Sequence, residues 1–335
     1  MSYSLRFRLL AIALVLAMVA TATPAPAVDP KLLPPDTEVV LTINLRQLLD
    51  AELAKTHQEG VRQLRTLLES HLTDADAQRY FEKIDFDLLR DLDRITVTSA
   101  GSKMPEFILL EGKFNAEKIA ATSKEAIEEH PDHLKAVQIE GQTAYEIRVD
   151  TDDHPVYAGL VGKDKFLVTQ TKDGFADAVV RINNRTQTSN KLKKELREVL
   201  GTAGDKRGIS LVATGPALVK LTEDATVQNL EQLQGVLQGI TALNLSLTLD
   251  KQVNFELVIN SKDKMSADEM AKLAGLGLAG VKIMLKGRAE KDARLEPAVQ
   301  IIESTRVTSQ NNNLVLTGHI TAAQLAKIIK DLPQK

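Results

Sequence analysis

Strands that come in pairs are the feature that most constrains how this chain can fold. Runs of apolar and β-branched residues recur two at a time, and a short turn joins the members of each pair. The predicted pairs are 95–99 with 107–114, 137–139 with 144–147, 156–161 with 165–171, 242–249 with 253–259, and 305–309 with 314–318. A short turn joins antiparallel strands, whereas parallel strands need a long crossover. The pattern therefore predicts an α+β fold with mainly antiparallel sheets and helices packed on one face.

Helix signals fill the spaces between these pairs. Asn115 is a favourable N-cap residue for a helix that continues through Ala120. Apolar spacing predicts further helices at 174–182, 225–238 and 295–303, one that begins near Ser266, and a last one capped by Thr321. Each half of the chain therefore alternates single helices with hairpins.

The order of elements repeats along the chain. Both halves read as strand, helix, hairpin, helix, hairpin and helix, which predicts an internal duplication of one unit. The 137–147 hairpin has no counterpart in the second half. The equivalences that follow are Val39 with Ile209 at an offset of 170, and Phe107 with Phe255 and Phe166 with Leu314 at an offset of 148.

The first residues predict export. Arg6 and Arg8 precede an apolar run at 9–20, which is shorter than the roughly 20 residues that a bilayer-spanning helix needs. Small residues follow, so cleavage is expected after Ala27, with Ala22 as a second candidate. The alternative is a retained N-terminal anchor. We expect an exported protein, periplasmic or extracellular, with no transmembrane segment in the mature chain.

Composition narrows the classes of function. Removing 1–27 takes away two arginines and no acid, so 42 basic residues become 40 against 45 acidic ones, a net charge of −5. Such a chain is a poor partner for nucleic acid. The chain has no cysteine, so its cores must hold it without disulfides, and roughly 300 residues suffice for that. Few aromatic residues and no tryptophan argue against a sugar-stacking site.

A polar stretch separates the two halves. The predicted division is a signal peptide at 1–27, an extended proline-rich lead-in at 28–36, an α+β domain at 37–182, a polar linker at 183–190 and a second α+β domain at 191–335.

The segment 275–280 spells GxGxxG. Dinucleotide binding needs those glycines in a turn from a strand into a helix, and here the residues before them are helical in pattern. We expect a pair of small-residue helices packed closely on the sheet. A further alternative is a helix at a membrane surface, because three lysines flank the apolar residues: Lys272, Lys282 and Lys286.

Four other motifs have plain structural explanations. His130 and His133 have a zinc-ligand spacing and His154 could join them, but Pro131 blocks a helix through the pair. The acidic turn at 150–153 lacks the glycine and glutamate of a calcium loop. The SxxK at 261–264 has none of the partner motifs of serine acyl-enzymes. The basic residues Lys191, Lys193, Lys194 and Arg197 alternate with acids as on a solvated helix face.

The stretches 33–44, 85–97 and 110–114 carry a resemblance. Their Pro-Pro-Asp start, Asp-x-Asp-Arg element and Gly-Lys-Phe strand end resemble uncharacterised exported proteins of planctomycete bacteria. That resemblance implies no activity.

We therefore expect a non-catalytic exported protein that binds an unknown protein or envelope component, with no catalytic, cofactor-binding or metal-binding residues. The alternatives are an exported hydrolase with a dispersed site, using Asp150, Asp152 and His154, and a membrane-surface accessory protein.

Overall fold

The computed structural model describes residues 28–56, 75–101, 105–148, 154–184, 192–202, 207–223 and 239–331. The strands are β1 (Val39–Asn44), β2 (Leu92–Ser99), β3 (Phe107–Gly112), β4 (Leu134–Ile139), β5 (Gln142–Ile147), β6 (Val156–Val161), β7 (Lys165–Thr169), β8 (Ile209–Thr214), β9 (Ile240–Leu249), β10 (Val253–Ser261), β11 (Arg306–Gln310) and β12 (Asn313–Ile320). Every predicted hairpin is present.

The helices within the same residues fall between the strands as expected. They are η1 (Pro30–Leu32), α2 (Leu45–Leu49), α3 (Glu52–Thr56), α5 (Ala75–Lys83), α6 (Leu88–Asp91), α7 (Ala116–Glu129), α8 (Lys172–Asn184), α9 (Lys194–Thr202), α10 (Gly215–Glu223), α12 (Lys264–Ala289), η3 (Ala293–Leu295), α13 (Glu296–Ser304) and α14 (Ala322–Asp331). The helix predicted at 225–238 lies outside the described residues.

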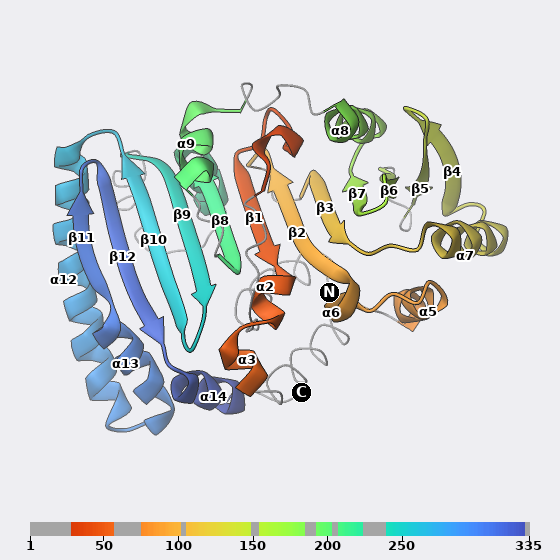
Figure 1. Cartoon of the computed structure of the whole chain (residues 1–335). Coiled ribbons are helices and arrows are strands. Elements are labelled where there is room, and N and C mark those ends of the chain that lie inside the picture. Colours follow the sequence, from red (N-terminus) through yellow and green to blue (C-terminus); the bar gives the residue numbers. More distant parts are fainter. Residues whose placement is uncertain are drawn as a thin grey trace.

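All these strands belong to one antiparallel sheet of twelve strands. Its order is β11-β12-β10-β9-β8-β1-β2-β3-β7-β6-β5-β4, and Figure 1 shows it running from β11 at one end to β4 at the other. The halves of the chain meet where β1 pairs with β8, with Leu41 opposite Leu211. The α+β class with antiparallel strands is confirmed, and one sheet contains the strands of both predicted domains.

Helices lie against both faces of this sheet, which differs from the expectation of one covered face. On the first face, Ile43 and Ile209 pack with Leu48 of α2; we call this the α2 face. On the other, Val40 and Val212 pack with Leu196 of α9, which defines the α9 face. Alternate residues of a strand point to opposite faces, and both sets are apolar near the junction of the halves, so each face needs a cover.

The two halves have the same strand order outward from the β1–β8 junction. On the α2 face, one row of directly paired residues runs Leu41, Val97, Ile108, Val168 and Ala158 in the first half and Leu211, Leu245, Leu257, Leu316 and Val307 in the second. All ten are apolar. The duplication itself stays a prediction, and superposing the halves is its test.

This pairing corrects one predicted equivalence. Phe166 and Leu314 occupy matching places, but Phe107 and Phe255 lie on opposite faces of the sheet. The offset in that strand is 149 rather than 148, as the pair Ile108 and Leu257 shows. A shift of one residue reverses the face, so two phenylalanines alone cannot fix the register.

Two predicted boundary segments are more ordered than expected. The lead-in at 28–36 contains η1, and Val28 and Leu33 are buried with Leu196 and Val212. The first residues of the predicted linker, Asn183 and Asn184, end helix α8. The rest of that linker, 185–190, lies outside the described residues, as do residues 1–27.

Local chemistry explains why several elements begin and turn where they do. The Asn115 side chain accepts a hydrogen bond from the backbone N–H of Lys118, as predicted for an N-cap. Asp263 caps α12 by accepting from the N–H of Ser266 at 2.8 Å. Glu140 and Gly141 both have positive φ, 49° and 72°, which is the two-residue turn that matches the twist of an antiparallel hairpin.

Candidate functional site

The GxGxxG segment lies in the middle of one continuous helix, α12. No helix N-terminus meets these glycines, so they cannot cradle a pyrophosphate as a dinucleotide loop does. The expected pair of small-residue helices packed on the sheet is also wrong. A Cβ atom added at Gly275, Gly277 or Gly280 would meet no other atom within 4 Å, so these positions lie open.

The histidines form no shared site. His130 ends helix α7, while the Nδ1 atom of His133 lies 3.2 Å from the carbonyl oxygen of Arg148, and both side chains are exposed. His154 is exposed as well, and Asp150, Asp152 and Asp153 fall outside the described residues. Within the described part of the chain, no three His, Asp or Glu side chains are grouped so as to hold a metal ion.

Ser261 serves a turn. Its hydroxyl lies 2.7 Å from the carbonyl oxygen of Asp263 and 2.8 Å from that of Asn312, and the residue is buried. Both partners are backbone acceptors, which cannot take the proton from a nucleophile as a general base does. The SxxK motif therefore stabilises the junction of β10, β12 and α12, as the sequence context indicated.

The basic segment before and within α9 is only partly a solvated face. Lys194 pairs with Glu198 one turn further along at 3.7 Å, as on an exposed helix. Lys193 instead donates a hydrogen bond to the buried carboxylate of Glu38, and Lys220 of α10 donates to the other oxygen at 3.1 Å. Lys191 lies outside the described residues.

Glu38 thereby joins elements from both halves of the chain. Burial raises the pKa of this carboxyl, but the bonds and charges of Lys193 and Lys220 outweigh burial and hold the pKa below its usual value. The backbone of Glu38 adds to the junction, because its carbonyl accepts from the N–H of Thr214 at 2.9 Å. Sequence patterns gave no sign of this contact, since the three residues are far apart in the chain.

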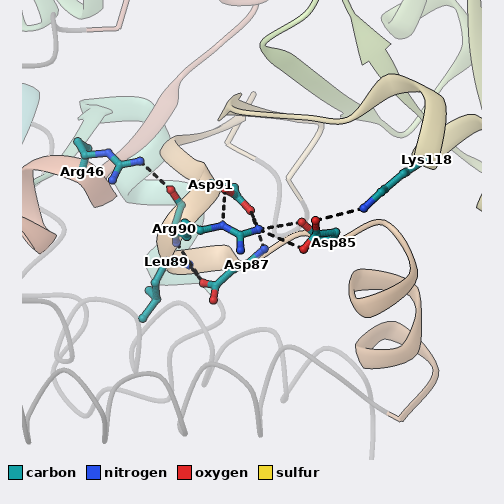
Figure 2. Close-up of polar contacts among 7 residues, drawn as sticks. All are labelled: Arg46, Asp85, Asp87, Leu89, Arg90, Asp91 and Lys118. Atoms are coloured by element: carbon teal, nitrogen blue, oxygen red, sulfur yellow. Dashed lines mark hydrogen bonds and ion pairs between the residues drawn. The ribbon is translucent and has the colours of Figure 1, made fainter.

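A dense set of charges surrounds helix α6 (Figure 2). Arg90 makes a two-pronged contact with Asp91, at 2.8 Å from Nε to Oδ1 and 2.6 Å from Nη2 to Oδ2. Asp87 caps the helix by accepting from the N–H groups of Leu89 and Arg90. The hydrogen bonds with Arg90 hold the pKa of Asp91 below its usual range, and those with Asp91 raise the pKa of Arg90.

The same set reaches two neighbouring elements. Lys118 of α7 lies 3.1 Å from Asp85 and lowers its pKa, and Arg46 of α2 donates to the carbonyl oxygen of Arg90 at 2.8 Å. Arg46 also pairs with Asp93. Basic groups therefore contact Asp85, Asp91 and Asp93, and we interpret this acidic stretch as a brace between helices and sheet.

A second polar network crosses the β1–β8 junction on the α9 face. Arg94 Nε donates to Asn44 Oδ1 at 2.9 Å, and Asn44 Nδ2 donates to the carbonyl oxygen of Arg207 at 2.6 Å. Each arginine also pairs with a glutamate: Arg94 of β2 with Glu111 of the neighbouring strand β3, and Arg207, which precedes β8, with Glu256 of β10. This network links the two halves of the chain. Its carboxylates contact arginines rather than each other, so they do not form the pair of carboxyl groups that could act as general acid and general base.

The outward face of α12 is the strongest candidate for a functional surface. Of the large apolar side chains that are exposed in the described chain, six lie on this helix: Met265, Leu273, Leu276, Val281, Ile283 and Met284. Leu276 and Ile283 are 72% and 74% exposed, and the seventh such residue, Val180, is on α8. Scattered apolar residues are normal on a surface, but a cluster on one helix marks an interaction site.

This helix is apolar on two opposite sides. Its inward side packs Met270, Ala271 and Ala274 against Leu314 and Leu316 of β12 on the α2 face. Figure 1 shows α12 along the β11 end of the sheet. The other side of the helix carries the exposed apolar side chains and is its outward side. We call the outward side, centred on Leu276 and Ile283, the α12 outer face.

Cations flank the α12 outer face. From Met270 to Ala289 the helix carries Lys272, Lys282, Lys286 and Arg288 and no acidic residue. Lys282 and Lys286 both contact Glu303 of α13, at 3.4 and 2.7 Å. Lys272 and Arg288 are exposed. No carboxylate of the described residues lies within 4 Å of the Lys272 ammonium nitrogen or of the Arg288 guanidinium nitrogens.

None of the helices in the described part of the chain has the length and apolar character needed to cross a bilayer.

Comparison with known proteins gives little further guidance. No family model matches the chain, and no curated protein matches it. Among solved structures, crystal forms I and III of TP0453, a Treponema protein, match at 13% identity with TM-scores of 0.43 and 0.45. The alignments cover 94% and 93% of this chain and 99% of each TP0453 chain. No functional conclusion follows from a likeness at this level.

Proposed function

We propose that this protein is an exported, non-catalytic scaffold that associates with the cell envelope through the α12 outer face. The observation that carries the proposal is the gathering of six exposed large apolar side chains on one helix. A chain of this length has a core large enough to bury such side chains. Leaving Leu276 and Ile283 in water is therefore unfavourable unless another surface covers them.

Other features support a scaffold more than an enzyme. Basic partners lower the pKa values of buried acids such as Glu38 and Asp91. These contacts hold parts of the fold together. A hydrolase site of this kind needs a nucleophile beside a base. Among the described residues, Ser261 of the SxxK motif has no side-chain base beside it, and His154 has no nucleophile beside it. The signal-like first residues support export.

The test is fractionation of cells that make the full-length protein. The double variant Leu276→Ser, Ile283→Ser removes the centre of the α12 outer face, and Val180→Ser on α8 is a matched loss of an exposed apolar side chain elsewhere. After lysis and washing, we expect wild type and Val180→Ser to remain with the envelope fraction and the double variant to be released.

Two results would overturn the proposal. One is a wild-type protein that is released as completely as the double variant. The other is a double variant that stays with the envelope as firmly as wild type does. All three substituted residues are exposed, so the folded state should survive the changes, and circular dichroism of each purified protein checks this.

A further inference from the structure

We infer that the partner of the α12 outer face is an anionic lipid surface, on which the helix lies parallel to the membrane. This inference rests on the proposed function and names the component that the helix binds. It begins from the two-sided apolar character of α12. A helix with two apolar sides needs two apolar environments, and the sheet supplies only one of them.

The charges around the face match a membrane interface. Helices that lie in the interface place apolar side chains below the lipid headgroups and lysine or arginine side chains at headgroup level. Along α12, Leu276 and Ile283 occupy the middle of the exposed side, and Lys272 and Arg288 lie toward opposite ends of it. Because the whole chain has a net charge of −3, attraction to an anionic surface must come from a local cationic region such as this one.

The small residues of the helix are compatible with this placement. Gly277, Gly280 and Gly287 have no atoms near a Cβ position, so nothing from the protein rises above the helix there. With about 1.5 Å of rise per residue, the 26 residues of α12 span about 39 Å, which allows several apolar side chains to enter the bilayer together.

Charge argues against a second copy of the chain as the occupant. Over residues 270–289, two α12 outer faces placed against each other would bring only cations together, because the acidic residues of α12, Asp268 and Glu269, lie at its N-terminal end. Like charges at such an interface oppose association. Phosphate headgroups, in contrast, pair with lysine and arginine and leave the acyl region for Leu276 and Ile283.

The absence of tryptophan from the chain makes a direct test simple. Leu276→Trp places a single reporter on the α12 outer face, and Val180→Trp places the control reporter on α8. Purified protein is mixed with vesicles of phosphatidylcholine alone, or of phosphatidylcholine with phosphatidylglycerol. We expect a blue shift of Leu276→Trp fluorescence with the anionic vesicles, no shift for Val180→Trp, and little binding to the neutral vesicles.

Charge and apolar variants then separate the two contributions in vesicle flotation. Neutralising Lys272 or Arg288 with glutamine should each weaken binding about fivefold, and both together about 25-fold. Replacing Leu276 by serine should weaken binding about tenfold or more. Salt should weaken the binding of wild type more than that of the double-glutamine variant.

The outcomes distinguish this inference from the proposed function. Equal binding to both kinds of vesicle, or no binding to either, would overturn the lipid inference, and so would a blue shift that rises with protein concentration when no vesicles are present. If α12 variants still lose envelope association in cells, the proposed function stands and its partner is not lipid. If those variants keep envelope association, the proposed function itself fails.

Discussion

Glu38 offers a sharp test of how the two halves of the sheet are held together. Its carboxylate is buried at the start of β1 and accepts hydrogen bonds from Lys193 and Lys220, which lie before α9 and within α10. Replacing Glu38 with glutamine keeps the shape of the side chain, removes the charge, and points an NH₂ group at one of the two ammonium groups. The change therefore tests the charge more than the packing.

The expected loss can be bounded from the contacts. A hydrogen bond to a charged group contributes about 1.5–3 kcal/mol, whereas an exposed ion pair contributes at most about 1 kcal/mol. The carboxylate is buried, but the lysine side chains are 44% and 50% exposed, so the bonds fall between these limits. We expect Glu38→Gln to lower the free energy of unfolding by about 2 kcal/mol at pH 7.

The loss should depend on pH in a definite direction. The folded-state pKa of Glu38 lies below its ordinary value of 4.5, so its stabilising effect is fully present above that value. The effect is lost as the pH falls through the folded-state pKa, because the wild-type carboxyl then becomes as neutral as the glutamine. The difference between wild type and Glu38→Gln should shrink below pH 4.5.

Urea unfolding at a series of pH values measures this difference. Glu198→Gln is the matched control, since Glu198 forms an exposed pair with Lys194 within α9 and should contribute nothing measurable. A Glu38→Gln loss that is the same at low and neutral pH would show that packing, not charge, is responsible. No loss at any pH would refute the reasoning entirely.

Three further predictions concern the core, the sheet and the α12 outer face. Leu33 is fully buried beside α9, so Leu33→Ala should lower the free energy of unfolding by about 2–5 kcal/mol in urea, while the exposed Leu276→Ala should change it little. A Cβ at Gly318 would lie 2.3 Å from the Phe255 ring, so Gly318→Ala should cost about 1–3 kcal/mol, and adding Phe255→Leu should restore part of the loss in the same assay. Glu303 contacts Lys282 and Lys286, so Glu303→Gln should free both cations and strengthen flotation with anionic vesicles several-fold, and unchanged flotation would separate these lysines from lipid binding.

Much of the fold was predictable because its signals are local. The hairpins follow from short turns between apolar runs, and at the turn of Glu140 and Gly141 the glycine is a residue that adopts positive φ readily. Asn115 begins α7 where a capping residue was expected. Each of these features depends on residues within a few positions of each other, so a single sequence contains the needed information.

The candidate site was only half visible in the sequence. The flanking lysines and the apolar residues of α12 suggested a membrane-surface helix, but the same pattern also suited a helix packed on the sheet. The structure uses both sides, with Met270 facing β12 and Leu276 exposed. Composition cannot show which side remains uncovered, because that depends on what the rest of the chain places beside the helix.

The sequence by itself determined where the paired strands lie, where helices such as α7 begin, and that the strands pair as antiparallel hairpins. Only the tertiary structure decided that β1 and β8 pair, that both faces carry helices, and that Phe107 and Phe255 point to opposite sides. The physical reason is one of range. Hairpins close through bonds between near neighbours, whereas Leu41 of β1 and Leu211 of β8 are 170 residues apart in the chain, and their pairing depends on apolar contacts made by distant segments.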